Sequence, residues 1–196
     1  MKTLKLYSVV VLLLMLACVK GFAQDGDDKI VGTATAKAES MKAQFGLNDT
    51  QYKSLYDLFV TTIKKENALW TSGKSRLDME AAKDQIHSDF VAGVKTIFTA
   101  DQYAKFDKPQ TKKSIKEGAK WRSAKMKDAL GLSKKQTKSV YNLIVSTTTK
   151  QNKLSAKAKD KTELYEGRIK LDDAFYAKMQ NILTAEQFEM FNKNHY

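Results

Sequence analysis

Few side chains in this sequence have the types and spacing that catalysis or metal binding requires. The chain has two histidines, His87 and His195, and one cysteine, Cys18. Asp84 and Asp89 lie near His87 at helical spacing, but a surface histidine beside acids is far commoner than a transition-metal site. Glycine-rich phosphate loops, HExxH and GxSxG motifs are absent from the sequence. We therefore expect no metal, no cofactor and no enzymatic activity.

The clearest chemical pattern is an excess of lysine in the second half of the chain. The formal net charge is +12 at pH 7; residues 24–110 hold 12 basic and 13 acidic side chains, and residues 111–196 hold 19 and 9. Two stripes follow helical spacing: Lys112, Lys116, Lys120 and Lys127, and, if one helix continues through them, Lys150, Lys153, Lys157 and Lys161.

Such stripes have two interpretations. They are either solvated helix faces or a surface that attracts acidic or disordered polypeptides, or anionic membrane headgroups. Nucleic acid is not an expected partner, because the sequence contains no nucleic-acid-binding motif.

Two tryptophans are further candidates for a binding surface. Most aromatic residues of the chain recur at helical spacing, which is typical of a core. Trp70 and Trp121 differ, because neither has an aromatic counterpart in the other half of the chain. We expect both to contact a bound polypeptide.

Four short segments share a pattern that predicts helix starts. Each has Asn, Ser or Thr followed three residues later by Gln: Asn48 and Gln51, Thr99 and Gln102, Ser133 and Gln136, Thr184 and Gln187. In such a capping box the first side chain accepts a hydrogen bond from a free backbone N–H of the first turn. The glutamine reaches back to the N–H of the cap, and each cap contributes about 1 kcal/mol.

The segments belong to a pattern that repeats at an offset of 85 residues. Gly46-Leu47 recurs as Gly131-Leu132, and about a third of the positions from 41 to 108 match their partners. Each copy predicts three longer helices and a short fourth one, and the turn near 156–161 is the least defined. The expected fold is therefore all-α, with two tandem helical-hairpin repeats, 24–110 and 111–196, that pack as a pseudo-dimer.

The first residues are predicted to be a targeting segment. An apolar run at 9–16 follows two lysines, and small residues lie at −3 and −1 of a cut between Ala23 and Gln24. Residues 1–23 are thus a secretory signal peptide. The alternative is a lipoprotein that is processed at Cys18. The expected location is the periplasm or the cell exterior.

This combination resembles the Spy/CpxP family of periplasmic proteins, which carry paired L-T-x-x-Q segments. The strict pattern occurs here once, at 183–187; the other three have Asn or Ser at the cap, or Phe at the first position. Family members form a helical hairpin that dimerises into a curved cradle. The resemblance therefore implies that the two repeats pack as two protomers would, and that this chain is a monomer.

The resemblance also implies a function. Family members act as chaperones for unfolded polypeptides without ATP, so we expect a polypeptide-binding protein. The alternative is a regulatory or structural protein of envelope stress, which docks on one partner such as a sensor protein and has no general chaperone activity.

Overall fold

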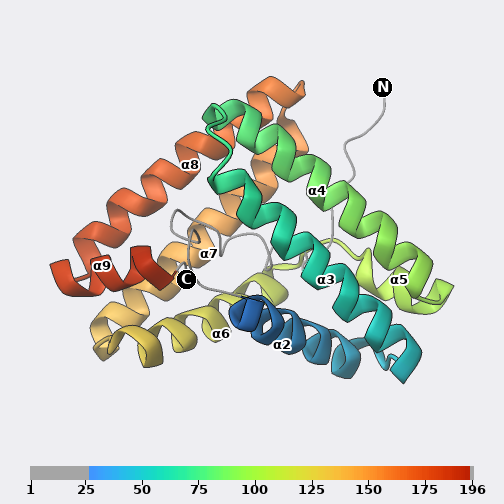
Figure 1. The fold of residues 1–196 in the computed structure, drawn as a ribbon. Helices are drawn as coiled ribbons and strands as arrows, with labels where there is room; N and C mark the ends of the chain where they lie inside the picture. The colour runs from blue at the N-terminus through green and yellow to red at the C-terminus, as the bar shows by residue number, and fades with distance from the viewer. Residues whose placement is uncertain (1–26, 195–196) are drawn as a thin grey trace. The chain divides into compact units, whose positions relative to one another are not determined.

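The structure is a computed structural model that describes residues 27–194 of the chain (Figure 1). In this range the regular elements are helices, and the predicted all-α fold is confirmed. The helices are α2 (Asp27–Phe45), α3 (Asp49–Trp70), α4 (Arg76–Ile97), α5 (Ala100–Phe106), α6 (Lys112–Leu130), α7 (Lys134–Lys157), α8 (Lys161–Ile182) and α9 (Ala185–Asn194). The predicted signal peptide and both of its processing sites, at Cys18 and at Ala23-Gln24, lie outside the described residues.

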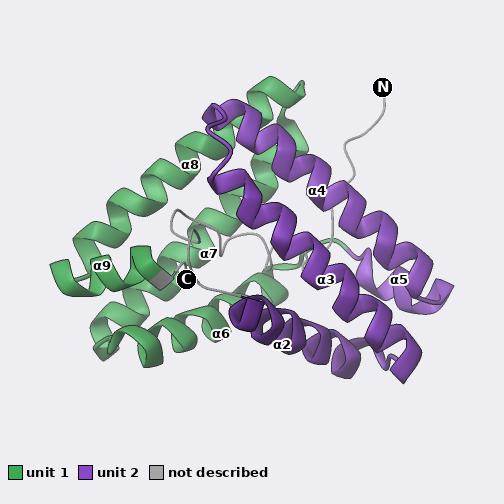
Figure 2. Ribbon diagram, viewed as in Figure 1, with its two compact units in different colours: residues 1–20, 109–196 green, residues 21–108 purple. Residues whose placement is uncertain are grey.

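The described residues divide into two compact units (Figure 2). The N-terminal unit, residues 27–108, contains α2 to α5, and the C-terminal unit, residues 109–194, contains α6 to α9. The boundary falls between Lys108 and Pro109, two residues before the boundary that the sequence predicts. Proline keeps the residue before it out of the helical conformation, which favours a break at this point.

Each unit is built around a central helix. In the N-terminal unit α3 packs against both α2 and α4, and the short α5 contacts α2. In the C-terminal unit α7 packs against α6 and α8, and α9 contacts both of these outer helices (Figure 1). Apolar side chains from all four helices form the core of the C-terminal unit, including Met126, Val140, Phe175, Met179 and Phe191.

Gly46 and Gly131 predict helix stops in the sequence, and they end the first helix of each unit in the structure. Gly46 follows α2 with φ of 63° and Gly131 follows α6 with φ of 62°. Residues with a Cβ rarely adopt this left-handed conformation, so glycine stops the helix at little cost. The sequence pattern predicts that this first helix begins near Thr35, whereas in the structure α2 begins earlier, at Asp27.

The four predicted capping boxes are all present. In the box before α3, the Gln51 backbone N–H donates to Asn48 Oδ1 at 2.8 Å, and Asn48 N–H donates to Gln51 Oε1 at 3.1 Å. Reciprocal bonds of the same kind, 2.9–3.3 Å long, join Thr99 with Gln102, Ser133 with Gln136, and Thr184 with Gln187.

The capping glutamines also connect the boxes to one another. Gln51 Nε2 donates to the Ile97 carbonyl at the end of α4 (2.9 Å) and to Gln102 Oε1 (2.7 Å). Gln102 Nε2 donates to the carbonyls of Phe45 and Gly46 at the end of α2 (3.3 and 3.2 Å). The last carbonyls of a helix have no partner within it, so the two glutamines satisfy both helix ends and join all four helices.

The C-terminal unit contains the same arrangement, which we call the glutamine clasp in both units. Gln136 Nε2 donates to the Ile182 carbonyl (3.1 Å) and to Gln187 Oε1 (2.6 Å). Gln187 Nε2 donates to the carbonyls of Leu130 and Gly131 (3.2 and 3.4 Å). Every residue of this clasp lies 85 positions after its counterpart in the N-terminal unit.

Candidate functional site

The positive charge of the C-terminal unit lies on two neighbouring helices. Helix α7 has six lysines and no acidic residue, and α6 has six lysines and one arginine against two acidic residues. Helix α8 has four basic and four acidic residues, so it contributes no net charge. Because α6 and α7 pack against each other, the excess charge is concentrated on one pair of helices.

All twelve of these lysines are exposed, and we call them the lysine surface. Its members are Lys112, Lys113, Lys116, Lys120, Lys125 and Lys127 on α6, and Lys134, Lys135, Lys138, Lys150, Lys153 and Lys157 on α7. Within residues 27–194 one of them has an ion pair, Lys113 with Glu117 at 4.0 Å. The protein's own carboxylates therefore neutralise little of the positive charge of the lysine surface.

The structure corrects the second predicted lysine stripe. Helix α7 ends at Lys157, and Lys161 is the first residue of α8. Asp160 caps α8, because its Oδ1 accepts a hydrogen bond from the Glu163 backbone N–H at 2.8 Å. Lys150, Lys153 and Lys157 thus share one helix, and Lys161 does not continue their row.

Sequence reasoning missed five of the twelve lysines of the lysine surface. Lys113, Lys125, Lys134, Lys135 and Lys138 were not candidates, because the search followed two rows at strict helical spacing. A count of charges over each helix identifies them, since α7 contains no acidic residue at all.

The two candidate tryptophans have different environments. Trp121 on α6 is 61% exposed, and Lys125 Nζ lies 5.5 Å from the centre of its ring. Trp70, the last residue of α3, is half-buried. Lys83 Nζ lies 4.8 Å from its ring and 2.8 Å from Glu80 Oε1, so Trp70 is part of a local contact between α3 and α4. Of the two, Trp121 has the exposure that a binding residue needs.

One further cation of α6 does not belong to the surface. Arg122 is half-buried, and its Nη2 donates to Thr148 Oγ1 on α7 at 3.2 Å. Burial lowers the pKa of the Arg122 guanidinium to about 10, which leaves it protonated at neutral pH. The hydrogen bond and the position of Arg122 indicate a role in packing α6 against α7.

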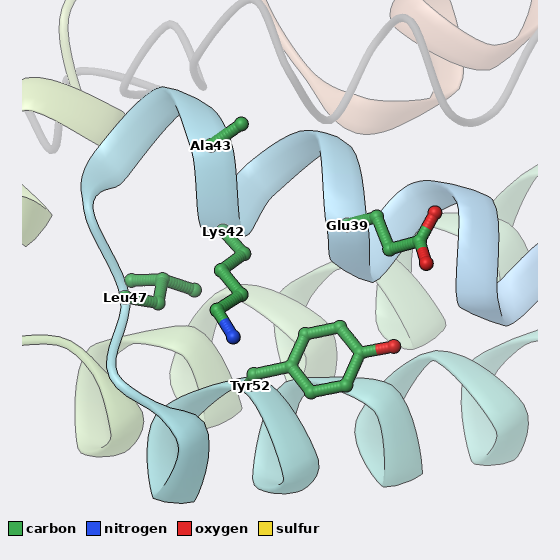
Figure 3. A pocket seen from close by; sticks show the side chains of 5 residues that line it. All are labelled: Glu39, Lys42, Ala43, Leu47 and Tyr52. Carbon is green, nitrogen blue, oxygen red and sulfur yellow. The ribbon is translucent and has the colours of Figure 1, made fainter.

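The N-terminal unit neutralises its central lysines internally. Three ion pairs connect its helices: Lys42 with Asp49 at 2.6 Å, Lys64 with Asp27 at 3.4 Å, and Lys65 with Asp89 at 3.2 Å. Figure 3 shows the surroundings of the first pair, a shallow hollow lined by Glu39, Lys42, Ala43, Leu47 and Tyr52. Lys42 Nζ also lies 5.1 Å from the centre of the Tyr52 ring, so its charge already has two local partners.

The described residues contain no arrangement suited to metal binding. No group of three or more His, Cys, Asp or Glu side chains in residues 27–194 lies close enough to hold a metal ion. His87 is buried at 9% exposure, whereas we expected a surface histidine. No helix in the same range is long and apolar enough to cross a membrane.

Comparison with known protein families, with curated proteins and with solved structures finds no match to this chain.

Proposed function

We propose that the protein is an exported holdase, which binds non-native polypeptides without a nucleotide, and that the lysine surface makes the first contact. The observation that carries the proposal is the set of twelve exposed lysines on α6 and α7, eleven of which have no ion pair within the described residues. The paired capping motifs, which resemble those of the Spy/CpxP family, also support it.

The chemistry of lysine suits this task. A concentrated positive field accelerates the encounter with acidic or disordered chains, because the attraction acts over about 10 Å at ordinary ionic strength. Once a chain is near, the long apolar stems of lysine can cover its hydrophobic segments while the ammonium groups stay in water. Trp121 adds an exposed aromatic contact on the same helix.

Suppression of aggregation tests the proposal. Two unrelated unfolding proteins, one of them acidic, are aggregated with and without the mature protein at ionic strengths of about 0.01 M and 1 M. We expect suppression of both clients at low salt and weaker suppression at high salt, with each client alone at each salt as the baseline. No suppression of either client would favour the alternative, a regulatory protein that docks on one partner.

A matched pair of variants separates the lysine surface from net charge. Lys120→Glu with Lys153→Glu reverses two charges of the surface. Lys170→Glu with Lys178→Glu reverses two exposed charges on α8, which has no excess of lysine. We expect the first pair to weaken suppression and the second to leave it close to that of the original protein.

A further inference from the structure

Lysines at equivalent positions in the two units differ in whether they form ion pairs. Helix starts and clasp hydrogen bonds coincide at an offset of 85 residues, so this offset identifies equivalent positions. Lys42 and Lys65 of the N-terminal unit correspond to Lys127 and Lys150 of the C-terminal unit. In the N-terminal unit both lysines form an ion pair with an aspartate of a neighbouring helix.

The aspartates of those pairs are missing from the C-terminal unit. The position of Asp49 is taken by Lys134 and that of Asp89 by Ala174. Asp27, which pairs with Lys64, is replaced by Lys112, and Lys64 itself is replaced by Thr149. Two acids that neutralise lysines in the first unit are thus replaced by further lysines in the second. Within the described residues, no carboxylate lies within ion-pair distance of Lys112, Lys127, Lys134 or Lys150.

These replacements are unfavourable for folding, so stabilisation of the fold does not explain why lysines occupy these positions. Asp27 and Asp49 lie in the first turns of α2 and α3, where a negative charge is stabilised by the helix dipole. Lys112 and Lys134 lie in the first turns of α6 and α7, where a positive charge is disfavoured. The positive charges at these two helix starts are therefore unfavourable for folding of the C-terminal unit.

We infer that Lys112, Lys127, Lys134 and Lys150 bind the carboxylates of an acidic polypeptide segment, which take the place of the missing aspartates. The N-terminal unit does not bind such a segment, because Asp49 and Asp89 neutralise the equivalents of Lys127 and Lys150. The equivalents of Lys112 and Lys134 are themselves aspartates. The inference rests on the proposed function and assigns the binding of acidic segments to the C-terminal unit.

Several features favour a carboxylate-bearing polypeptide over other polyanions. The known partner of the equivalent lysine, Lys42, is an aspartate. The exposed cations of α6 and α7 are all lysines, whereas phosphate recognition favours the two-pronged contacts of arginine. Trp121 is the one strongly exposed large apolar side chain on α6 and α7, so the surface offers neither a row of aromatic rings for bases nor an apolar band for a membrane.

Binding of fluorescent polyglutamate to the mature protein tests this inference. Lys112→Asp with Lys134→Asp restores the acids that the N-terminal unit has at these positions. Its matched control is Lys170→Asp with Lys178→Asp, which changes the net charge equally on α8. We expect the first pair to weaken binding about tenfold and the control to weaken it less than about threefold. Thermal melts check folding, and the new acids at helix starts should not lower the midpoint.

The opposite change should create binding in the N-terminal unit. Asp27→Lys with Asp49→Lys removes two of its internal carboxylates, and we expect stronger polyglutamate binding and a higher stoichiometry. Asp57→Lys with Asp101→Lys adds the same charge at two exposed positions that have no ion pair in the described chain, and should have a smaller effect.

Three results would overturn the inference. Equal loss of binding by both lysine pairs would show that net charge alone matters. Tighter binding of single-stranded DNA of equal charge would identify a phosphate polyanion, and tighter binding of phosphatidylglycerol vesicles would identify a membrane surface. Failure of the holdase proposal would give a different result. Selective polyglutamate binding without suppression of aggregation would support the inference and exclude the general chaperone function.

Discussion

At the scale of single residues, each capping glutamine performs two tasks with the two ends of one amide. Gln136 Oε1 accepts the Ser133 N–H at 3.0 Å, which completes the cap of α7. Gln136 Nε2 donates to the Ile182 carbonyl and to Gln187, which lie on other parts of the unit. The first task requires only an acceptor, whereas the second requires a donor.

Replacement of Gln136 by Glu separates these tasks. Glutamate is a normal residue in a capping box and suits a helix start, so the cap is retained. The donor is lost, and a carboxylate then faces two acceptors, so we expect a loss of about 1–3 kcal/mol in the free energy of unfolding. Chemical denaturation measures it, and Lys135→Glu at the neighbouring exposed position controls for the added charge. An unchanged stability would show that the clasp bonds contribute nothing.

Removal of the cap oxygen should have a smaller effect. Ser133→Ala leaves the Gln136 backbone N–H without its acceptor, and Thr184→Ala does the same to Gln187. We expect each change to cost about 1 kcal/mol. The measurement is again chemical denaturation, with Ser146→Ala, on the exposed face of α7, as a control that is expected to have little effect. If neither cap variant lowers the midpoint, the caps are not stabilising.

At the scale of elements, the ion pairs between helices give the N-terminal unit a pH dependence. The hydrogen bond from Lys42 holds the pKa of Asp49 below its ordinary value of 3.8. Hydrogen bonds from Gln85 and Lys65 do the same for Asp89. A carboxyl whose pKa is lowered by folding stabilises the fold above its unfolded pKa, and this stabilisation disappears as the pH falls through the folded value.

Asp49→Asn should therefore lower the melting temperature at pH 7 and have progressively less effect below pH 3.8. The effect is small, because Asp49 is exposed and solvent screens its charge. Thermal melts of both proteins from pH 7 to pH 2.5 measure the difference. Asp101→Asn is the control, because Asp101 is an exposed acid in the first turn of α5 with no ion pair among the described residues. A difference that stays constant across this range would contradict the assigned role of Lys42.

At the scale of the whole molecule, residues 27–194 form two units of four helices with the same clasp in each. A unit of about 80 residues has a thin core, so we expect the two units of the tandem arrangement to stabilise each other. The pseudo-dimer that the sequence predicts remains a prediction. Its consequence is a mature protein that is monomeric and unfolds in one cooperative transition.

Calorimetry and sedimentation of the mature chain test this prediction. We expect a single transition, with equal calorimetric and van't Hoff enthalpies, and the mass of a monomer. Gln136→Glu changes the C-terminal unit alone, so in a cooperative molecule it should shift the whole transition. Two transitions, of which the variant moves one, would show two independent units and end the pseudo-dimer proposal.

The sequence by itself determined the all-helical fold and those helix boundaries that carry a capping box or a glycine. The capping boxes act between residues three positions apart, and Gly46 and Gly131 act on their own backbone, so local pattern was enough to predict them. The concentration of lysine in the second half was equally visible, because net charge is a sum over the sequence. The sequence also shows, by comparison at the offset of 85 residues, that the second half lacks counterparts of Asp27, Asp49 and Asp89.

Tertiary structure alone decided which distant groups meet. The carbonyls that Gln51 and Gln102 bind lie 46 to 57 residues away, and no local pattern specifies such a distance. The burial of His87 and the partial burial of Trp70 depend in the same way on neighbouring helices. The break at Ala158, which separates Lys161 from α7, lacks a glycine or proline signal and became clear only with the Asp160 cap in place. Local chemistry sets where helices begin and end, whereas packing sets what their side chains contact.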